Sequence, residues 1–200
     1  MYNNHIRITV SGAQGTGKTT LINALKKVYP FFDIQKEPVR SVIKKKENVN
    51  FADKEKQLII LEKQRNFLQD NIAVLTDRCP LDSLSYTKML RDEGLSNIDD
   101  ELFEYIWQQS AGILESDLID IMILLPIEFP LIDDGFRVMD DKQQKKVQRI
   151  MEDYATEFLL GDTIIVPHGS VEERVEFCKE YIDKLLRKYV EKDLAEKANK

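Results

Sequence analysis

The chain has 200 residues and a formal net charge of −6, with 42% hydrophobic and 32% charged residues. This length and composition indicate one globular domain with a sizeable core, and the acidic balance argues against broad electrostatic binding of nucleic acid. The two cysteines form no Cys-x-x-Cys pair, no apolar stretch reaches membrane-spanning length, and the polar start lacks a signal peptide, so we expect a cytoplasmic protein without a zinc site or disulfide framework.

The first predicted element is a strand at His5–Val10, which leads directly into the pattern Gly12-x4-Gly17-Lys18-Thr19. A helical apolar spacing begins inside the pattern, so the strand, the glycine-rich loop and the helix stand in the order of a phosphate-binding P-loop. In such a loop the backbone N–H groups cradle phosphates, Lys18 reaches the terminal phosphates of ATP, and the Thr19 hydroxyl binds Mg²⁺. The predicted nucleotide-binding residues are Gly12, Ala13, Gln14, Gly15, Thr16, Gly17, Lys18, Thr19 and Thr20.

The second predicted strand, Phe31–Lys36, is followed by Glu37-Pro38. A carboxylate at this strand end is suited to take the proton from a hydroxyl that attacks the γ-phosphate of ATP. A Glu at the start of a helix, favoured by the macrodipole, fits the position equally well. The helix after it carries Gln57, Gln64 and Arg65. These side chains could bind the edge of a base or sugar, but the pattern favours a solvent-exposed face of the helix.

The third predicted strand, Ile72–Thr76, ends at Asp77-Arg78. An acid that ends an apolar strand in a P-loop fold favours a role in orienting Mg²⁺, and the planar fork of Arg78 suits a phosphate. The competing interpretation is a surface ion pair of little value. On the following helix, weaker candidates for lining an acceptor pocket are Asp82, Ser83 and Tyr86.

The fourth predicted strand, Ile119–Leu125, is followed by a loop with two prolines and a glycine. This loop and the basic stretch after it predict a lid at about 127–149, in which Arg137 crosses over the phosphates. The exposed face of a helix is favoured for Lys145, Lys146 and Arg149.

The fifth predicted strand, Thr163–Val166, precedes a turn with His168, where an adenine often lies in this fold. His168 is interpreted as a loop residue and not as an acid–base catalyst. Ser170 and Glu173 then form a capping box for the last helix. Continuous apolar strands that alternate with helices predict a parallel sheet buried on both faces, here a three-layer α/β P-loop fold with five strands. We expect one domain over residues 1–190 and a charged tail over 191–200.

Two short motifs resemble those of deoxynucleoside kinases. Glu37-Pro38-Val39 resembles their Glu-Pro-Val, in which the Glu is the general base, and Asp77-Arg78 resembles their acid–Arg–Ser element, with Cys79 in place of the Ser. A longer set is also similar to nicotinamide-riboside kinase-like P-loop ATPases, many of them virus-encoded: Arg40, Gln64, Leu81, Asp82, Tyr86 and Asp134-Gly135-Phe136-Arg137. The resemblance covers His5 to about Tyr181 and implies a kinase with Glu37 as base and with Arg78 and Arg137 as phosphate contacts.

These observations predict an ATP- and Mg²⁺-dependent phosphotransferase with Lys18, Glu37, Asp77, Arg78 and Arg137 as its catalytic residues. Thr19 and Asp77 are the predicted metal ligands. The acceptor would be a nucleoside, a nucleotide or a related ribosyl compound, and a modified base in DNA is less favoured. The alternative is a P-loop switch that hydrolyses the nucleotide and acts on a partner macromolecule. The sequence leaves open which acceptor is used, whether ATP or GTP is the donor, and whether Glu37 or Asp77 is the general base. It also leaves open the oligomeric state, for which a homodimer is one possibility.

Overall fold

The computed structural model describes residues 5–36, 54–94, 98–116, 118–130, 141–158 and 162–198. Two of the predicted catalytic residues, Glu37 and Arg137, lie outside the described residues, as does most of the loop that begins the predicted lid. Statements below about the fold and the site concern the described residues.

Five parallel strands form one sheet in the order β2-β3-β1-β4-β5. Their bounds are β1 Ile6–Ser11, β2 Asp33–Gln35, β3 Ala73–Asp77, β4 Ile121–Leu124 and β5 Asp162–Ile165. Each predicted strand is present, with ends shifted by one or two residues. β1 lies in the middle of the sheet, so the loop after it opens at the centre of the edge where the strands end.

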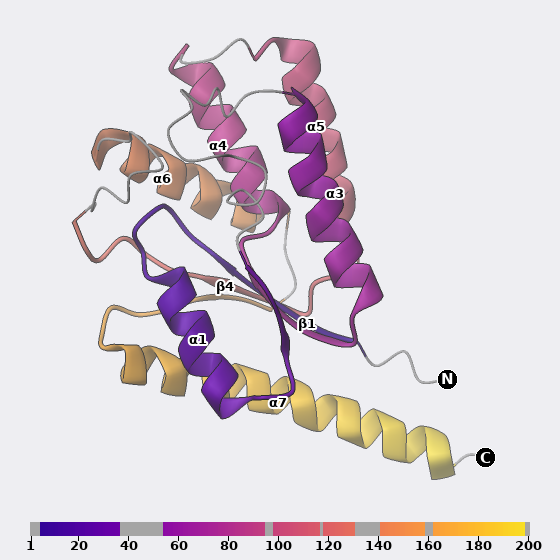
Figure 1. Cartoon of the computed structure of the whole chain (residues 1–200). Helices are drawn as coiled ribbons and strands as arrows, with labels where there is room; N and C mark the ends of the chain where they lie inside the picture. The colour runs from indigo at the N-terminus through magenta and orange to yellow at the C-terminus, as the bar shows by residue number, and fades with distance from the viewer. Residues whose placement is uncertain are drawn as a thin grey trace.

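Helices cover both faces of the sheet, which makes the three-layer architecture that the alternating pattern predicts (Figure 1). α1 and α7 lie on one face, and α3, α4, α5 and α6 lie on the other. Their bounds are α1 Lys18–Val28, α3 Lys54–Asp70, α4 Pro80–Asp92, α5 Asp100–Leu114, α6 Asp141–Glu157 and α7 Val171–Ala198. The last helix thus continues through most of the charged tail.

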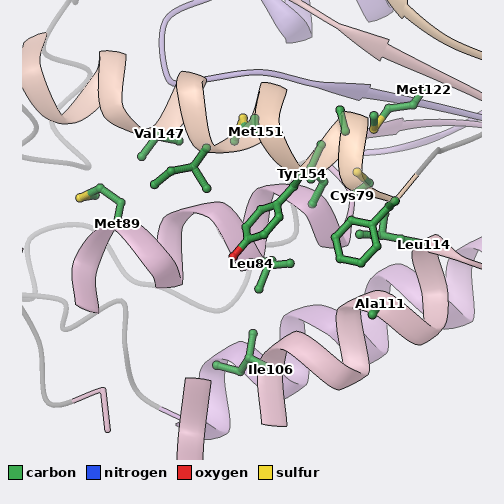
Figure 2. Packing of buried hydrophobic residues seen from close by; sticks show 14 of the residues in the cluster. Cys79, Leu84, Met89, Ile106, Ala111, Leu114, Met122, Val147, Met151 and Tyr154 are labelled. Atoms are coloured by element: carbon green, nitrogen blue, oxygen red, sulfur yellow. The ribbon is translucent and has the colours of Figure 1, made fainter. Parts of the chain in front are cut away.

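Alternate residues of β4 pack into two separate hydrophobic clusters, one on each face of the sheet. In β4, Ile121 and Ile123 pack with the apolar stripe of α7, whereas Met122 and Leu124 pack with α4, α5 and α6. Figure 2 shows this second core, where Val147 and Met151 of α6 face α4. Both faces of the sheet are therefore covered by apolar side chains. A ligand would bind at the edge of the sheet where the strands end. Among the described helices none is long and apolar enough to span a membrane.

Candidate active site

The loop between β1 and α1 has the backbone of a phosphate cradle. Gly12, Gly15 and Gly17 have φ values of 143°, 79° and 88°, which residues with a Cβ rarely adopt. A Cβ on Gly12 would lie 2.8 Å from the Leu125 carbonyl oxygen. Gly17 is the N-cap of α1 and offers no side chain to cap it, so the first-turn N–H groups remain available to an anion.

Lys18 lies across this loop with its side chain buried. Its Nζ donates to the Gly12 and Ala13 carbonyl oxygens at 2.8 and 2.7 Å, and to Thr16 Oγ1 at 3.4 Å. An ammonium held among the loop carbonyls places a positive charge inside the cradle, where the terminal phosphates of a nucleotide would lie.

A hydroxyl and a carboxylate meet beside the cradle. The exposed Thr19 donates from Oγ1 to Asp77 Oδ2 at 2.5 Å, and Asp77 is the buried last residue of β3. Mg²⁺ is usually held by one or two protein oxygens together with phosphates and water, so this pair fits the ion that the sequence predicts. No group of three or more His, Cys, Asp or Glu side chains that could hold a metal ion is found in the described part of the chain.

Arg78, the residue after Asp77, has a strained backbone and a fixed side chain. Its φ of 82° is rare for a long side chain, and such strain is usual at functional sites. Its Nη1 pairs with Asp82 Oδ1 at 2.8 Å, and its guanidinium lies over the Tyr86 ring. Asp77 and Arg78 are each 4% exposed, so the interpretation of this dipeptide as a surface pair is wrong.

Asp82 holds Arg78 in place. Its Oδ2 accepts from Ser11 Oγ at 2.6 Å and from the Cys79 N–H at 3.0 Å, while Oδ1 faces Arg78. Cys79, which replaces the Ser of the kinase motif, is the N-cap of α4. Burial, with a smaller effect from Asp82, raises the pKa of its thiol to about 12, so Cys79 is an inert packing residue.

The solvated-face interpretation of α3 is wrong for two of its three residues. Gln57 and Gln64 are 5% and 2% exposed, on the buried face that also carries Ile60, Leu61 and Leu68, and only Arg65 is exposed. The Gln35 amide at the end of β2 donates to the Lys63 carbonyl, which places this part of α3 at the carboxyl edge of the sheet. Gln64 Oε1 is buried and has no hydrogen-bond partner among the described residues.

Arg174 contacts the P-loop and was not among the sequence candidates. Its Nη1 donates to the Thr16 carbonyl at 3.2 Å, and it forms an ion pair with Glu128. Burial lowers the pKa of its guanidinium. The signal was its place on the apolar stripe of α7, between Val171 and Cys178, where an Arg needs a buried partner.

Two glutamines of α6 also contact the P-loop and were missed. Gln148 Oε1 accepts from the Ala13 N–H at 3.0 Å, and Gln144 Nε2 donates to the Gln14 carbonyl at 2.6 Å. Both side chains lie on the face of α6 that carries Val147 and Met151. Away from that face, Lys145 and Arg149 are exposed, as predicted, whereas Lys146 is half-buried and pairs with Glu93.

The turn after β5 lies near Arg174. Glu128 accepts from the Gly169 N–H at 3.1 Å and lies 3.8 Å from Nδ1 of the exposed His168. His168 therefore lies in a loop, as predicted. That this turn borders an adenine stays a prediction.

The fold and the loop geometry define a P-loop nucleotide-binding protein. A family model described as an AAA domain matches residues 7–174, so the chain belongs to this AAA domain family. No curated protein sequence matches the chain significantly.

Solved structures of two kinases and of NadR have the same fold. Deoxyadenosine kinase from M. mycoides is 17% identical with a TM-score of 0.66, over 90% of this chain and 100% of that one. Thymidylate kinase from Candida albicans is 14% identical with a TM-score of 0.65, over 90% and 92%. NadR in complex with NR is 19% identical with a TM-score of 0.67, over 89% of this chain and 52% of NadR. The predicted P-loop kinase fold is thus confirmed, and at these identities the likeness concerns the fold alone.

Proposed function

We propose that the protein transfers the γ-phosphate of ATP to a nucleoside, a nucleotide or a related ribosyl acceptor. The observation that carries this proposal is the bond between Thr19 and Asp77 beside the buried Lys18, which joins the groups needed for Mg²⁺ and for terminal phosphates at one place. The neighbours that share the fold include a deoxyadenosine kinase with bound dATP and a NadR with bound AMP-PNP, which supports ATP as the donor.

In this mechanism the loop amides and Lys18 bind the β- and γ-phosphates. Thr19 and Asp77 would hold Mg²⁺, which would supply positive charge to offset the negative charge that develops during transfer. Because Asp77 already accepts a hydrogen bond from Thr19, we assign Asp77 to the metal and Glu37 to the proton of the attacking hydroxyl. Arg78, aimed by Asp82, and Arg137 would stabilise negative charge on the transferred group.

The buried amides of α3 support an acceptor with hydrogen-bonding edges. A buried amide oxygen without a partner costs free energy, and a nucleobase or ribose donor would satisfy Gln64 Oε1, which has none in the described part of the chain. Gln64 lies on a helix at the same edge of the sheet as the P-loop, so the donor and acceptor halves of the site would face each other.

The alternative, a nucleotide-hydrolysing switch, also fits the AAA domain family, and the fate of the γ-phosphate separates the two. Labelled ATP is incubated with nucleosides, nucleoside monophosphates, nicotinamide riboside and base-modified DNA. Label on one of these acceptors supports the kinase. Label that passes only to water, for every acceptor, contradicts the kinase and supports the switch.

A further inference from the structure

Two side chains of α6 fix the main chain of the P-loop from about 130 residues away in the sequence. The Ala13 N–H donates to Gln148 Oε1 at 3.0 Å, and the Gln14 carbonyl accepts from Gln144 Nε2 at 2.6 Å. One glutamine accepts and the other donates, so together they hold a donor at one end and an acceptor at the other end of the Ala13-Gln14 segment. Both glutamines are nearly inaccessible to solvent, at 6% and 2% exposure.

The helix that carries these glutamines is held firmly. Val147 and Met151 are fully buried in the core that α6 shares with α4, and Met89 lies on the side of α4 that faces α6 (Figure 2). Gln148 Nε2 also donates to Glu152 Oε1 at 2.9 Å, which turns its oxygen toward Ala13. The amide groups are thus presented to the loop by a packed helix and not by a mobile surface side chain.

The segment that is fixed is also the one that supports Lys18. The Ala13 carbonyl accepts from Lys18 Nζ at 2.7 Å, while the N–H of the same residue is held by Gln148. A shift of this segment would move the lysine and turn the loop amides away from the phosphates. Groups that bind a phosphate tightly must be held in place before it arrives.

We propose that Gln144 and Gln148 are positioning residues that pre-organise the P-loop and Lys18 for the triphosphate. This inference rests on the proposed function, because it assumes that the loop binds ATP. Neither glutamine needs to touch the nucleotide. Their effect passes through the backbone of Ala13 and Gln14.

The test uses Met substitutions, which keep the length of the side chain but remove the amide. Gln144→Met and Gln148→Met are compared with Gln108→Met on α5, where the amide donates to the exposed Glu104 and not to the P-loop. The dissociation constant of Mg²⁺-ATP is measured by calorimetry at a temperature at which each variant is folded. We expect each α6 variant to bind ATP about tenfold more weakly, or about 1.4 kcal/mol, and Gln108→Met to bind as the wild type does.

A rescue variant separates positioning from general packing. Gln148→Glu combined with Glu152→Gln retains an oxygen that can accept from Ala13 and keeps the net charge, so we expect it to regain most of the ATP affinity lost in Gln148→Met. Hydrogen exchange of the Ala13 amide in the nucleotide-free protein is the second measurement, and it should speed up in Gln148→Met and slow again in the rescue variant.

Two outcomes would overturn the proposal. One is unchanged ATP affinity in folded Gln144→Met and Gln148→Met, even if both melt at a lower temperature. The other is faster exchange of the Ala13 amide without weaker ATP binding. A wild-type protein that binds no ATP would contradict the proposed function itself. The exchange measurement needs no nucleotide, so it would still show whether Gln148 holds the Ala13 amide, and the two failures can be told apart.

Discussion

At the scale of single residues, Asp82 determines how Arg78 is presented. Its two oxygens accept hydrogen bonds from Ser11, from the Cys79 N–H and from Arg78 itself. The Arg78 guanidinium is therefore held in one position. The left-handed backbone at Arg78 directs the side chain toward this tether. Strain of this kind costs on the order of 1–3 kcal/mol and is retained where function requires a fixed direction.

The first prediction concerns Lys18. We expect Lys18→Ala to reduce phosphoryl transfer by about a hundredfold or more, because it removes the positive charge held inside the cradle. Lys27→Ala, an exposed lysine of the same helix, is the control and should transfer at the wild-type rate. The rate is measured as label that moves from ATP to an acceptor. Equal rates of transfer in the two variants would show that the Lys18 side chain is not needed for phosphoryl transfer.

The second prediction concerns Glu37, which lies outside the described residues. If it is the base, Glu37→Gln lowers turnover by about a hundredfold or more while ATP binding stays at the wild-type level, because the amide cannot take a proton. Turnover is measured with saturating acceptor, and ATP affinity by calorimetry. Undiminished turnover would show that the base is another group.

At the scale of secondary-structure elements, α7 illustrates a prediction from local sequence that the structure confirms. Ser170 Oγ accepts from the Glu173 N–H at 3.2 Å, and the Glu173 carboxylate accepts from the Ser170 N–H at 2.8 Å. These reciprocal bonds are the predicted capping box. The backbone N–H of Ser170, and then its hydroxyl, lower the pKa of Glu173.

The third prediction follows from this capping box. Ser170→Ala should lower the free energy of unfolding by about 1 kcal/mol at neutral pH, measured by urea denaturation, because an N-terminal amide of α7 loses its partner. Thr156→Ala is the control, since the exposed Thr156 donates to the Glu152 carbonyl of its own helix. An equal effect in the two variants would contradict a special role for the cap.

The capping box also predicts the sign of a pH effect. Because the pKa of Glu173 is lowered in the folded state, its stabilising contribution is present above the ordinary glutamate pKa of 4.5 and is lost as the pH falls through the pKa of the folded state. The free energies of unfolding of the wild type and of Glu173→Gln, measured by urea denaturation, should therefore differ at neutral pH and become equal in acid.

What sequence reasoning missed has a common physical form. Apolar runs such as the one through Ile8 and Val10 mark strands because burial requires apolar side chains, and the P-loop is a local motif. Gln148 and Arg174 are polar side chains on buried faces of helices, and their roles depend on contacts with distant segments. Periodicity assigns such residues to solvent, although a polar side chain on an apolar stripe is itself a signal.

At the scale of the whole molecule, the acidic balance bears on the class of acceptor. A net charge of −6 repels the phosphate backbone of DNA, whereas a small acceptor needs only the local positive charge of Lys18 and Arg78. The carboxyl edge of the sheet is where the P-loop, Asp77 and α3 meet, and both faces of the sheet are closed by helices.

The fourth prediction is that the protein is not retained on DNA at moderate salt. It is measured by passing the protein over immobilised duplexes, with and without modified bases, at increasing ionic strength. Retention at moderate salt that is lost as salt rises would indicate phosphate contacts and would favour a base in DNA as the acceptor.

The central claim is that the γ-phosphate of ATP passes to an acceptor and not to water. The most direct measurement is the amount of inorganic phosphate relative to ADP formed from Mg²⁺-ATP, with and without the pooled acceptors. We predict that ADP accumulates only when an acceptor is present and that little inorganic phosphate accompanies it. Equal amounts of ADP and inorganic phosphate, formed at the same rate with or without acceptors, would contradict the account.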